Sequence, residues 1–221
     1  MTTSARRRAV PHEQPPATGR ARAWSSWAGA TTGAWKPIGV ALAAGAVALA
    51  ALATAARLFD EPVSTFTRDV QDYTGVSWYT GAFSTITLIA WAAVATLGLV
   101  VAWLEPVERR RMGAFAAVVL LLLLDDAFLL HEAVGPENGV TQVVFVVAYA
   151  VAGLALLAMF LRSPRSGSSI ALVVGGALLA LALLADQVMA KNFLLEDGLK
   201  LLGILVWMAV PLTALPRPRR D

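Results

Sequence analysis

The chain contains no cysteine among its 221 residues. Thiolates are needed for disulfides, for iron–sulfur clusters and for cysteine-type zinc sites, so all three are excluded, as is a cysteine nucleophile. Histidine is nearly as scarce, because His12 and His131 are the only two. Since His12 lies in the N-terminal tail, we expect neither bis-histidine haem nor a di-iron site built on paired Glu-x-x-His elements. No P-loop appears either, so nothing indicates a nucleotide cofactor.

Charge is also scarce, at 15% of residues against 57% hydrophobic. This balance is too apolar for an ordinary soluble domain and indicates a membrane protein. The 18 basic residues outnumber the 15 acidic ones, and such an excess is one feature of proteins that bind nucleic acid. Their positions explain the excess better as membrane orientation, so we expect the lipid bilayer as partner and no nucleic acid.

Six stretches are long and apolar enough to cross the hydrocarbon, which takes roughly 20 residues. The predicted fold class is therefore all-α: a polytopic membrane protein with a bundle of six transmembrane helices. A short amphipathic outer helix is expected between the first two spans. The predicted spans are Ile38–Ala56, Gly81–Leu104, Met112–Leu130, Val140–Leu161, Ile170–Met189 and Phe193–Leu215.

The basic residues are distributed unevenly between the two ends of these spans. Fourteen of the 18 fall in the two tails and the second and fourth links. By the positive-inside rule, both termini are then cytoplasmic, which requires an even number of spans. The sequence predicts a multi-pass protein of the cell membrane.

Three segments follow along the chain: a disordered basic cytoplasmic tail (1–36), the transmembrane domain (37–216) and a short cytoplasmic tail (217–221). The first outer link, Asp60–Tyr79, has apolar residues at helical spacing. We expect an amphipathic helix there, serving either as a connector that packs on the bundle or as a lid over a cavity.

Ionisable side chains inside apolar spans cost several kcal/mol unless they are paired, neutralised or wetted, so they indicate a functional site. With both termini in the cytoplasm, the ionisable side chains of the third, fifth and sixth spans all lie towards the outer leaflet. They are Asp125, Asp126, His131, Glu132, Asp186, Glu196, Asp197 and Lys200.

The adjacent pair Asp125 and Asp126 is the strongest signal, because leucines precede it and apolar residues follow it. At 100° per residue, His131 would point about 120° away from Asp125 on a continuous helix, so the third-span groups would not meet at one atom. Lys200 lies three and four residues after Asp197 and Glu196, a spacing that predicts local charge neutralisation. The alternatives without a function are an ion pair at a helix end for the sixth-span group, and solvated side chains at the membrane interface for His131 and Glu132.

Two chemistries suit this set. Carboxylates with one imidazole bind a hard or borderline divalent ion, and the candidate metal ligands are Asp125, Asp126, His131, Glu132 and Asp186. Carboxylates can also activate water without a metal. The candidate catalytic residues are Asp125, Asp126, Glu196, Asp197 and Lys200.

Two fragments resemble motifs of glutamate-dependent intramembrane proteases of the CAAX-processing and PrsW kind. Glu196-Asp197-Gly198-Leu199-Lys200 is similar to their acid-acid-x-x-Lys motif, and the segment Phe128–Glu132 to their Phe-x-x-x-Glu motif. The order is reversed and the family's His-x-x-x-Asp is missing. The resemblance implies a carboxylate-based proteolytic mechanism as one alternative.

Three functions remain open on sequence alone. The first is an intramembrane enzyme with hydrolase-type chemistry on a lipid or membrane-embedded substrate. The second is a proton- or cation-coupled carrier, and the third a non-catalytic accessory subunit of a membrane complex. A site confined to the outer leaflet favours the enzyme, since a carrier needs access from both faces. Small residues in the first span and at Gly175-Gly176 allow close helix packing and a homo-oligomer.

Overall fold

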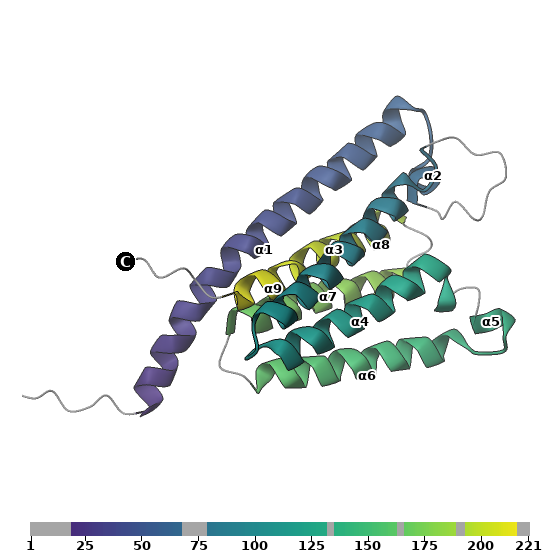
Figure 1. Cartoon of the computed structure of the whole chain (residues 1–221). Helices are drawn as coiled ribbons and strands as arrows, with labels where there is room; N and C mark the ends of the chain where they lie inside the picture. The colour runs from purple at the N-terminus through teal and green to yellow at the C-terminus, as the bar shows by residue number, and fades with distance from the viewer. Residues whose placement is uncertain (1–18, 68–78, 132–134, 163–165, 189–192, 216–221) are drawn as a thin grey trace, which may run out of the picture.

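The computed structural model describes residues 19–67, 79–131, 135–162, 166–188 and 193–215, although not the side chains of 19–33, 166 and 186–188. Every regular element in these ranges is helical, as the sequence predicts. The helices, labelled as in Figure 1, are α1 (Gly19–Leu58), α2 (Val63–Thr67), α3 (Ala82–Leu104), α4 (Arg109–Phe128), α5 (Gly135–Glu137), α6 (Gln142–Leu161), α7 (Ser166–Val188), α8 (Phe193–Trp207) and α9 (Ala209–Ala214).

The long helices form one bundle (Figure 1). Helix α8 packs against α1, α3 and α7, while α4 lies between α3 and α6, and α6 in turn contacts α7. The short helices α2 and α5 lie at one end of the bundle, and the start of α1 and helix α9 lie towards the other. The described chain therefore begins and ends towards the same end of the bundle.

In the part of the chain that the structure describes, four helices are long and apolar enough to cross a membrane: residues Ala34–Leu58 of α1, Ala82–Leu104, Gln142–Leu161 and Gly167–Ala185. The third and sixth predicted spans do form helices, but these fall short of the same criterion. Helix α4 carries charged residues near both of its ends. Helix α8 has only 15 residues, and Pro211 cannot donate a backbone hydrogen bond to the Trp207 carbonyl, so α8 and α9 are separate.

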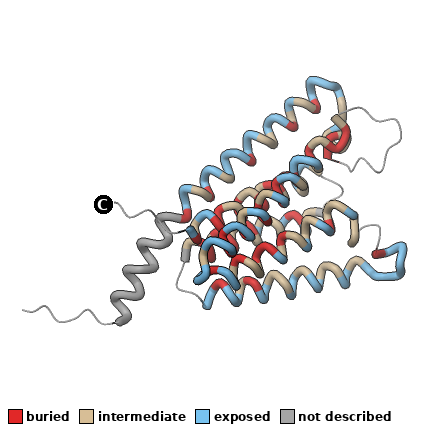
Figure 2. Tube along the Cα trace, viewed as in Figure 1, coloured by how far each residue is buried: buried red, intermediate tan, exposed pale blue. Residues whose placement is uncertain are grey.

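The surface of the bundle is apolar where a bilayer would surround it. Buried positions concentrate on the inward faces of α3, α4 and α8, whereas residues 34–58 of α1 and most of α6 are largely exposed (Figure 2). Val47 on α1 is 70% exposed, and Val143 and Leu154 on α6 are 67% and 65% exposed. An apolar surface of this extent is typical of contact with lipid. The four candidate spans and this surface indicate a multi-pass membrane protein in contact with lipid.

Helices α7 and α8 approach closely at a glycine pair. A Cβ atom on Gly175 would lie 2.2 Å from Trp207 Cδ1 and 2.9 Å from the Gly203 carbonyl oxygen. Trp207 donates a hydrogen bond to the Leu172 carbonyl at 3.1 Å and makes edge contacts with Trp91 and Phe115. The predicted close packing is confirmed at Gly175, where glycine makes room for an indole at the centre of the bundle.

The predicted outer and N-terminal segments are described only in part. Helix α2 covers the start of the expected amphipathic helix and packs against α1, α3 and α8, as a connector would. Residues 68–78 lie outside the described residues. Helix α1 begins at Gly19, inside the segment 1–36 predicted as a tail, and residues 1–18 are also outside the described ranges.

Candidate functional site

The end of α4 brings an imidazole back onto a buried carboxylate. Leu129 adopts a left-handed conformation (φ 51°, ψ 42°), which ends α4 after Phe128 and changes the direction of the chain. The His131 backbone N–H donates to Asp125 Oδ1 at 3.1 Å, and His131 Nδ1 lies 2.7 Å from Asp125 Oδ2. The prediction that His131 points away from Asp125 was therefore wrong, because it assumed that the helix continues to Leu130.

Asp125 is 5% exposed, and a third group also binds it. The Tyr149 hydroxyl of α6 interacts with its carboxylate. Two contacts with His131 and one with Tyr149 satisfy the carboxylate and fix its orientation, which is what a buried charge requires. Sequence reasoning missed Tyr149. It is the one residue between Val143 and Leu161 with a hydroxyl or other strong hydrogen-bonding side chain, and a buried tyrosine hydroxyl needs a partner.

The neighbouring carboxylate, Asp126, pairs with a different helix. Lys200 Nζ of α8 contacts Asp126 Oδ1, which links α4 to α8. The sequence predicted that Lys200 would be neutralised by Glu196 or Asp197 on its own helix. Lys200 does interact electrostatically with Asp197, but its direct contact with Asp126 joins residues 74 positions apart.

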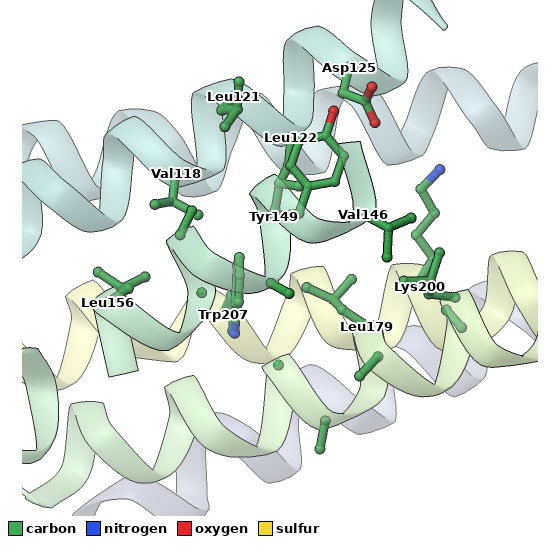
Figure 3. Close-up of a pocket in the computed structure, with 18 of the residues that line it drawn as sticks. Val118, Leu121, Leu122, Asp125, Val146, Tyr149, Leu156, Leu179, Lys200 and Trp207 are labelled. Atoms are coloured by element: carbon green, nitrogen blue, oxygen red, sulfur yellow. The ribbon is translucent and has the colours of Figure 1, made fainter. Parts of the chain in front are cut away.

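These groups form the polar end of a cavity of about 580 Å³. Figure 3 shows the Tyr149 hydroxyl and the Lys200 ammonium both directed towards the end of the cavity at which Asp125 lies, while Leu156 and Trp207 lie at the opposite end. Helices α3, α4, α6, α7 and α8 all contribute to the wall. The polar lining residues are Asp125, Asp126, His131, Tyr149, Glu196 and Lys200.

The structure brings four of the five predicted catalytic residues to this cavity: Asp125, Asp126, Glu196 and Lys200. Asp197 does not line it. Asp197 instead lies near Thr67 of α2, whose buried hydroxyl makes no well-formed hydrogen bond. Since α2 supplies none of the lining residues, the described part of the outer link is not a lid over this cavity.

The predicted metal ligands are only partly described. Glu132 and the side chain of Asp186 lie outside the described residues. Among the described residues, no group of three or more histidine, aspartate or glutamate side chains is arranged to hold a metal ion. The Asp125 carboxylate and the His131 imidazole contact each other, but the Asp126 carboxylate pairs with the Lys200 ammonium. Binding of a divalent ion stays a prediction.

A protein-family model matches residues 40–214, which include every residue that lines the cavity. The chain belongs to this family. It is described as a domain of unknown function, DUF8692. No curated protein and no solved structure matches the chain.

The contact between Asp126 and Lys200 leads to a stability prediction for this DUF8692 protein. Lys200→Met leaves the Asp126 carboxylate without its cation in a partly buried place. Removing one partner of a fully buried pair costs about 3–5 kcal/mol, so we expect about 1–3 kcal/mol here. Lys200→Met combined with Asp126→Asn should recover most of the loss, because no uncompensated charge remains. Thermal unfolding in detergent measures both effects.

Asp197→Asn supplies the matched control, since it removes the acid that lies three residues from Lys200. We expect Lys200→Met with Asp197→Asn to recover less stability than Lys200→Met with Asp126→Asn. Equal recovery in the two double variants would mean that Lys200 is neutralised within α8, and the link between α4 and α8 would carry no energetic weight.

Proposed function

We propose that this protein is an intramembrane hydrolase that acts on an amphiphilic lipid. The observation that carries the proposal is a single cavity with an apolar body and an acid–imidazole pair at one end. Such a cavity matches an amphiphile, because the apolar wall accommodates a chain and the polar end receives the head group with its scissile bond.

His131 is the proposed general base. Asp125 accepts a hydrogen bond from Nδ1 and so fixes the tautomer in which Nε2 carries the lone pair. Nε2 takes a proton from water as the water oxygen attacks the carbonyl carbon of the substrate. The resulting imidazolium then returns this proton to the leaving group when the bond breaks. Tyr149 acts as a positioning residue, since it holds Asp125 and thereby the imidazole.

We further propose that all six long helical segments cross the membrane, with both termini cytoplasmic. Helix α4 has 20 residues and is therefore about 30 Å long, enough to span the hydrocarbon with its charges near the two surfaces. Helices α8 and α9 together form the last crossing. The basic residues at the start of α4 support a cytoplasmic position for the end of the bundle opposite the acid–imidazole pair.

A cavity that opens towards only one side of the membrane favours an enzyme over a carrier. Beyond the cavity, Phe115 packs against both Trp207 and Phe160, and the Arg111 guanidinium lies 4.5 Å from the centre of the Phe160 ring. Arg111 also pairs with Glu108 at 2.8 Å. A carrier must open a path through this packed end, whereas a hydrolase needs only entry from the outer leaflet or from the lipid at its side.

The test is the release of product from lipid vesicles that contain the purified protein and a panel of ester-linked and amide-linked lipids, followed by mass spectrometry. We expect one linkage class to be cleaved. Gly153→Phe should abolish cleavage, because Gly153 lines the cavity and a Cβ atom there meets nothing within 4 Å. The added ring can therefore fill the cavity without a backbone clash.

Gly39→Phe is the matched control. A Cβ atom at Gly39 also meets nothing within 4 Å, but Gly39 is exposed on α1, away from the cavity. This variant should cleave as the wild type does. Absence of cleavage in every linkage class, or equal cleavage by Gly153→Phe and the wild type, would contradict the proposed function.

A further inference from the structure

Helix α6 is fixed to the bundle at one of its ends. It is the least buried of the four candidate spans, and its two buried residues, Leu156 and Phe160, both lie near its end. The Phe160 ring packs against Phe115 of α4, and the Arg111 guanidinium lies 4.5 Å from its centre. Ser169 Oγ of α7 donates a hydrogen bond to the Phe160 carbonyl at 3.1 Å. This end of α6 is therefore anchored to both α4 and α7.

The first half of α6, residues 142–152, is held much less firmly. None of its residues is buried, because one face borders the cavity and the other faces the surroundings, with Val143 67% and Val151 61% exposed. Phe145 packs against Gly135, but Gly135 belongs to α5, the short helix next to α6 in the chain. Segments with few buried apolar contacts open at a low cost in free energy. Displacement of this half would therefore expose little additional apolar surface.

Tyr149 ties this half of α6 to α4. Its hydroxyl is directed towards the end of the cavity at which Asp125 lies (Figure 3), and it interacts with the Asp125 carboxylate. Gln142 is the only other residue between 142 and 152 with a polar side chain. A single hydrogen bond between membrane helices contributes little free energy, so a contact of this kind breaks and forms readily.

Gly153 lies between the anchored end of α6 and its first half. A glycine inside a helix weakens that helix relative to alanine, because the backbone has more conformational freedom. At Gly175 the close packing of Trp207 requires a glycine, but a Cβ atom at Gly153 would meet nothing within 4 Å. Packing therefore does not explain Gly153. Small residues are common at the points where elements bend during domain and loop closure.

We propose that residues 142–152 of α6 form a lateral gate to the cavity, hinged at Gly153 and latched by Tyr149 on Asp125. When the latch is released, this half moves away from α4 while Phe160 stays in place. The polar end of the cavity then opens to the surrounding lipid, so the occupant is a molecule dissolved in the bilayer that enters from the side. Closure returns the tyrosine to the carboxylate and separates the occupant from the lipid. The gate does not depend on the chemistry of the site.

Distances between spin labels measure this motion directly. Because the chain contains no cysteine, labels can be attached at chosen positions without the removal of native residues. The gate pair is Thr54→Cys on α1 with Val143→Cys on α6, and the anchor pair is Val40→Cys on α1 with Leu161→Cys on α6. All four side chains are exposed, so labels should be tolerated. Double electron–electron resonance of the full chain in lipid nanodiscs should give one narrow distance for the anchor pair. We expect a main distance and a second, longer one for the gate pair.

Three variants test the latch and the hinge. Tyr149→Phe removes the hydroxyl but keeps the ring, and should raise the ratio of the longer to the shorter gate distance by roughly three- to twentyfold, which corresponds to the strength of hydrogen bonds between membrane helices. Gly153→Ala should lower the same ratio, because alanine stiffens the helix. Tyr79→Phe is the matched control. The Tyr79 hydroxyl lies 3.4 Å from Glu61 and not on α6, so the ratio should not change.

The outcomes separate the gate from the proposed function, because no readout uses lipid cleavage. A single narrow gate distance in both the wild type and Tyr149→Phe would overturn the gate, even in a protein that cleaves lipid. Equal broadening of the anchor pair would also overturn it, since the whole of α6 would then move. An equal rise of the ratio in Tyr79→Phe would show that Tyr149 is not the latch. Two gate distances that respond to Tyr149→Phe in a protein that cleaves no lipid would support the gate and contradict the hydrolase.

Discussion

Gly175→Leu is expected to destabilise this protein by roughly 1–3 kcal/mol or more, a large share of the stability of a typical domain. A Cβ atom at this position would lie 2.2 Å from Trp207 Cδ1 and 2.9 Å from the Gly203 carbonyl oxygen. Either α7 and α8 must separate or the indole must leave its place. Displacement of Trp207 would also break its hydrogen bond to Leu172 and its contacts with Trp91 and Phe115. Thermal unfolding and folded yield in detergent measure the effect.

Gly153→Leu provides the comparison, because it makes the same change in another apolar helix where a Cβ atom meets nothing within 4 Å. This variant should unfold within a few degrees of the wild type. If Gly175→Leu were equally stable, the close approach of α7 and α8 at this glycine would not be required for folding. Trp207 would then not form a fixed end of the cavity.

His131→Gln is expected to lower the turnover number of lipid hydrolysis by 10²–10⁴-fold, which is the usual contribution of a general base. Glutamine retains hydrogen-bonding capacity but cannot take up a proton near neutral pH. The Michaelis constant should change little, because the chain of the substrate is held by the apolar wall. Initial rates over a range of substrate concentrations separate the two parameters.

Asp125→Asn tests the second member of the pair. The amide of asparagine has the same size but no longer fixes the Nδ1–H tautomer of His131, so turnover should also fall by more than tenfold. Glu137→Gln, at an exposed position in α5, removes a carboxylate outside the cavity and should have no effect. Folded yield is measured for each variant. Turnover of well-folded His131→Gln within twofold of the wild type would exclude His131 as the base.

The sequence determined the class of protein and the neighbourhood of the site. Long apolar runs at helical length require a helical membrane bundle, because backbone polar groups in lipid must be satisfied within each segment. The same reasoning identifies Asp125 and Asp126, since two adjacent carboxylates among leucines need partners. Helix direction then places Lys200 and Glu196 at the same depth, and the structure brings all four residues to one cavity.

Only the tertiary structure decided which groups meet. Helical phase separates His131 from Asp125, and the left-handed turn at Leu129, which hydropathy and spacing do not reveal, brings them within 2.7 Å. Tyr149 contributes to the site because α6 packs beside α4, and nothing local to α6 predicts that neighbour. Lys200 has acids one turn away on its own helix, yet it also reaches Asp126 on α4. The physical reason is the same in each case: sequence spacing fixes direction within one helix, whereas the packing of one helix against another fixes the partners.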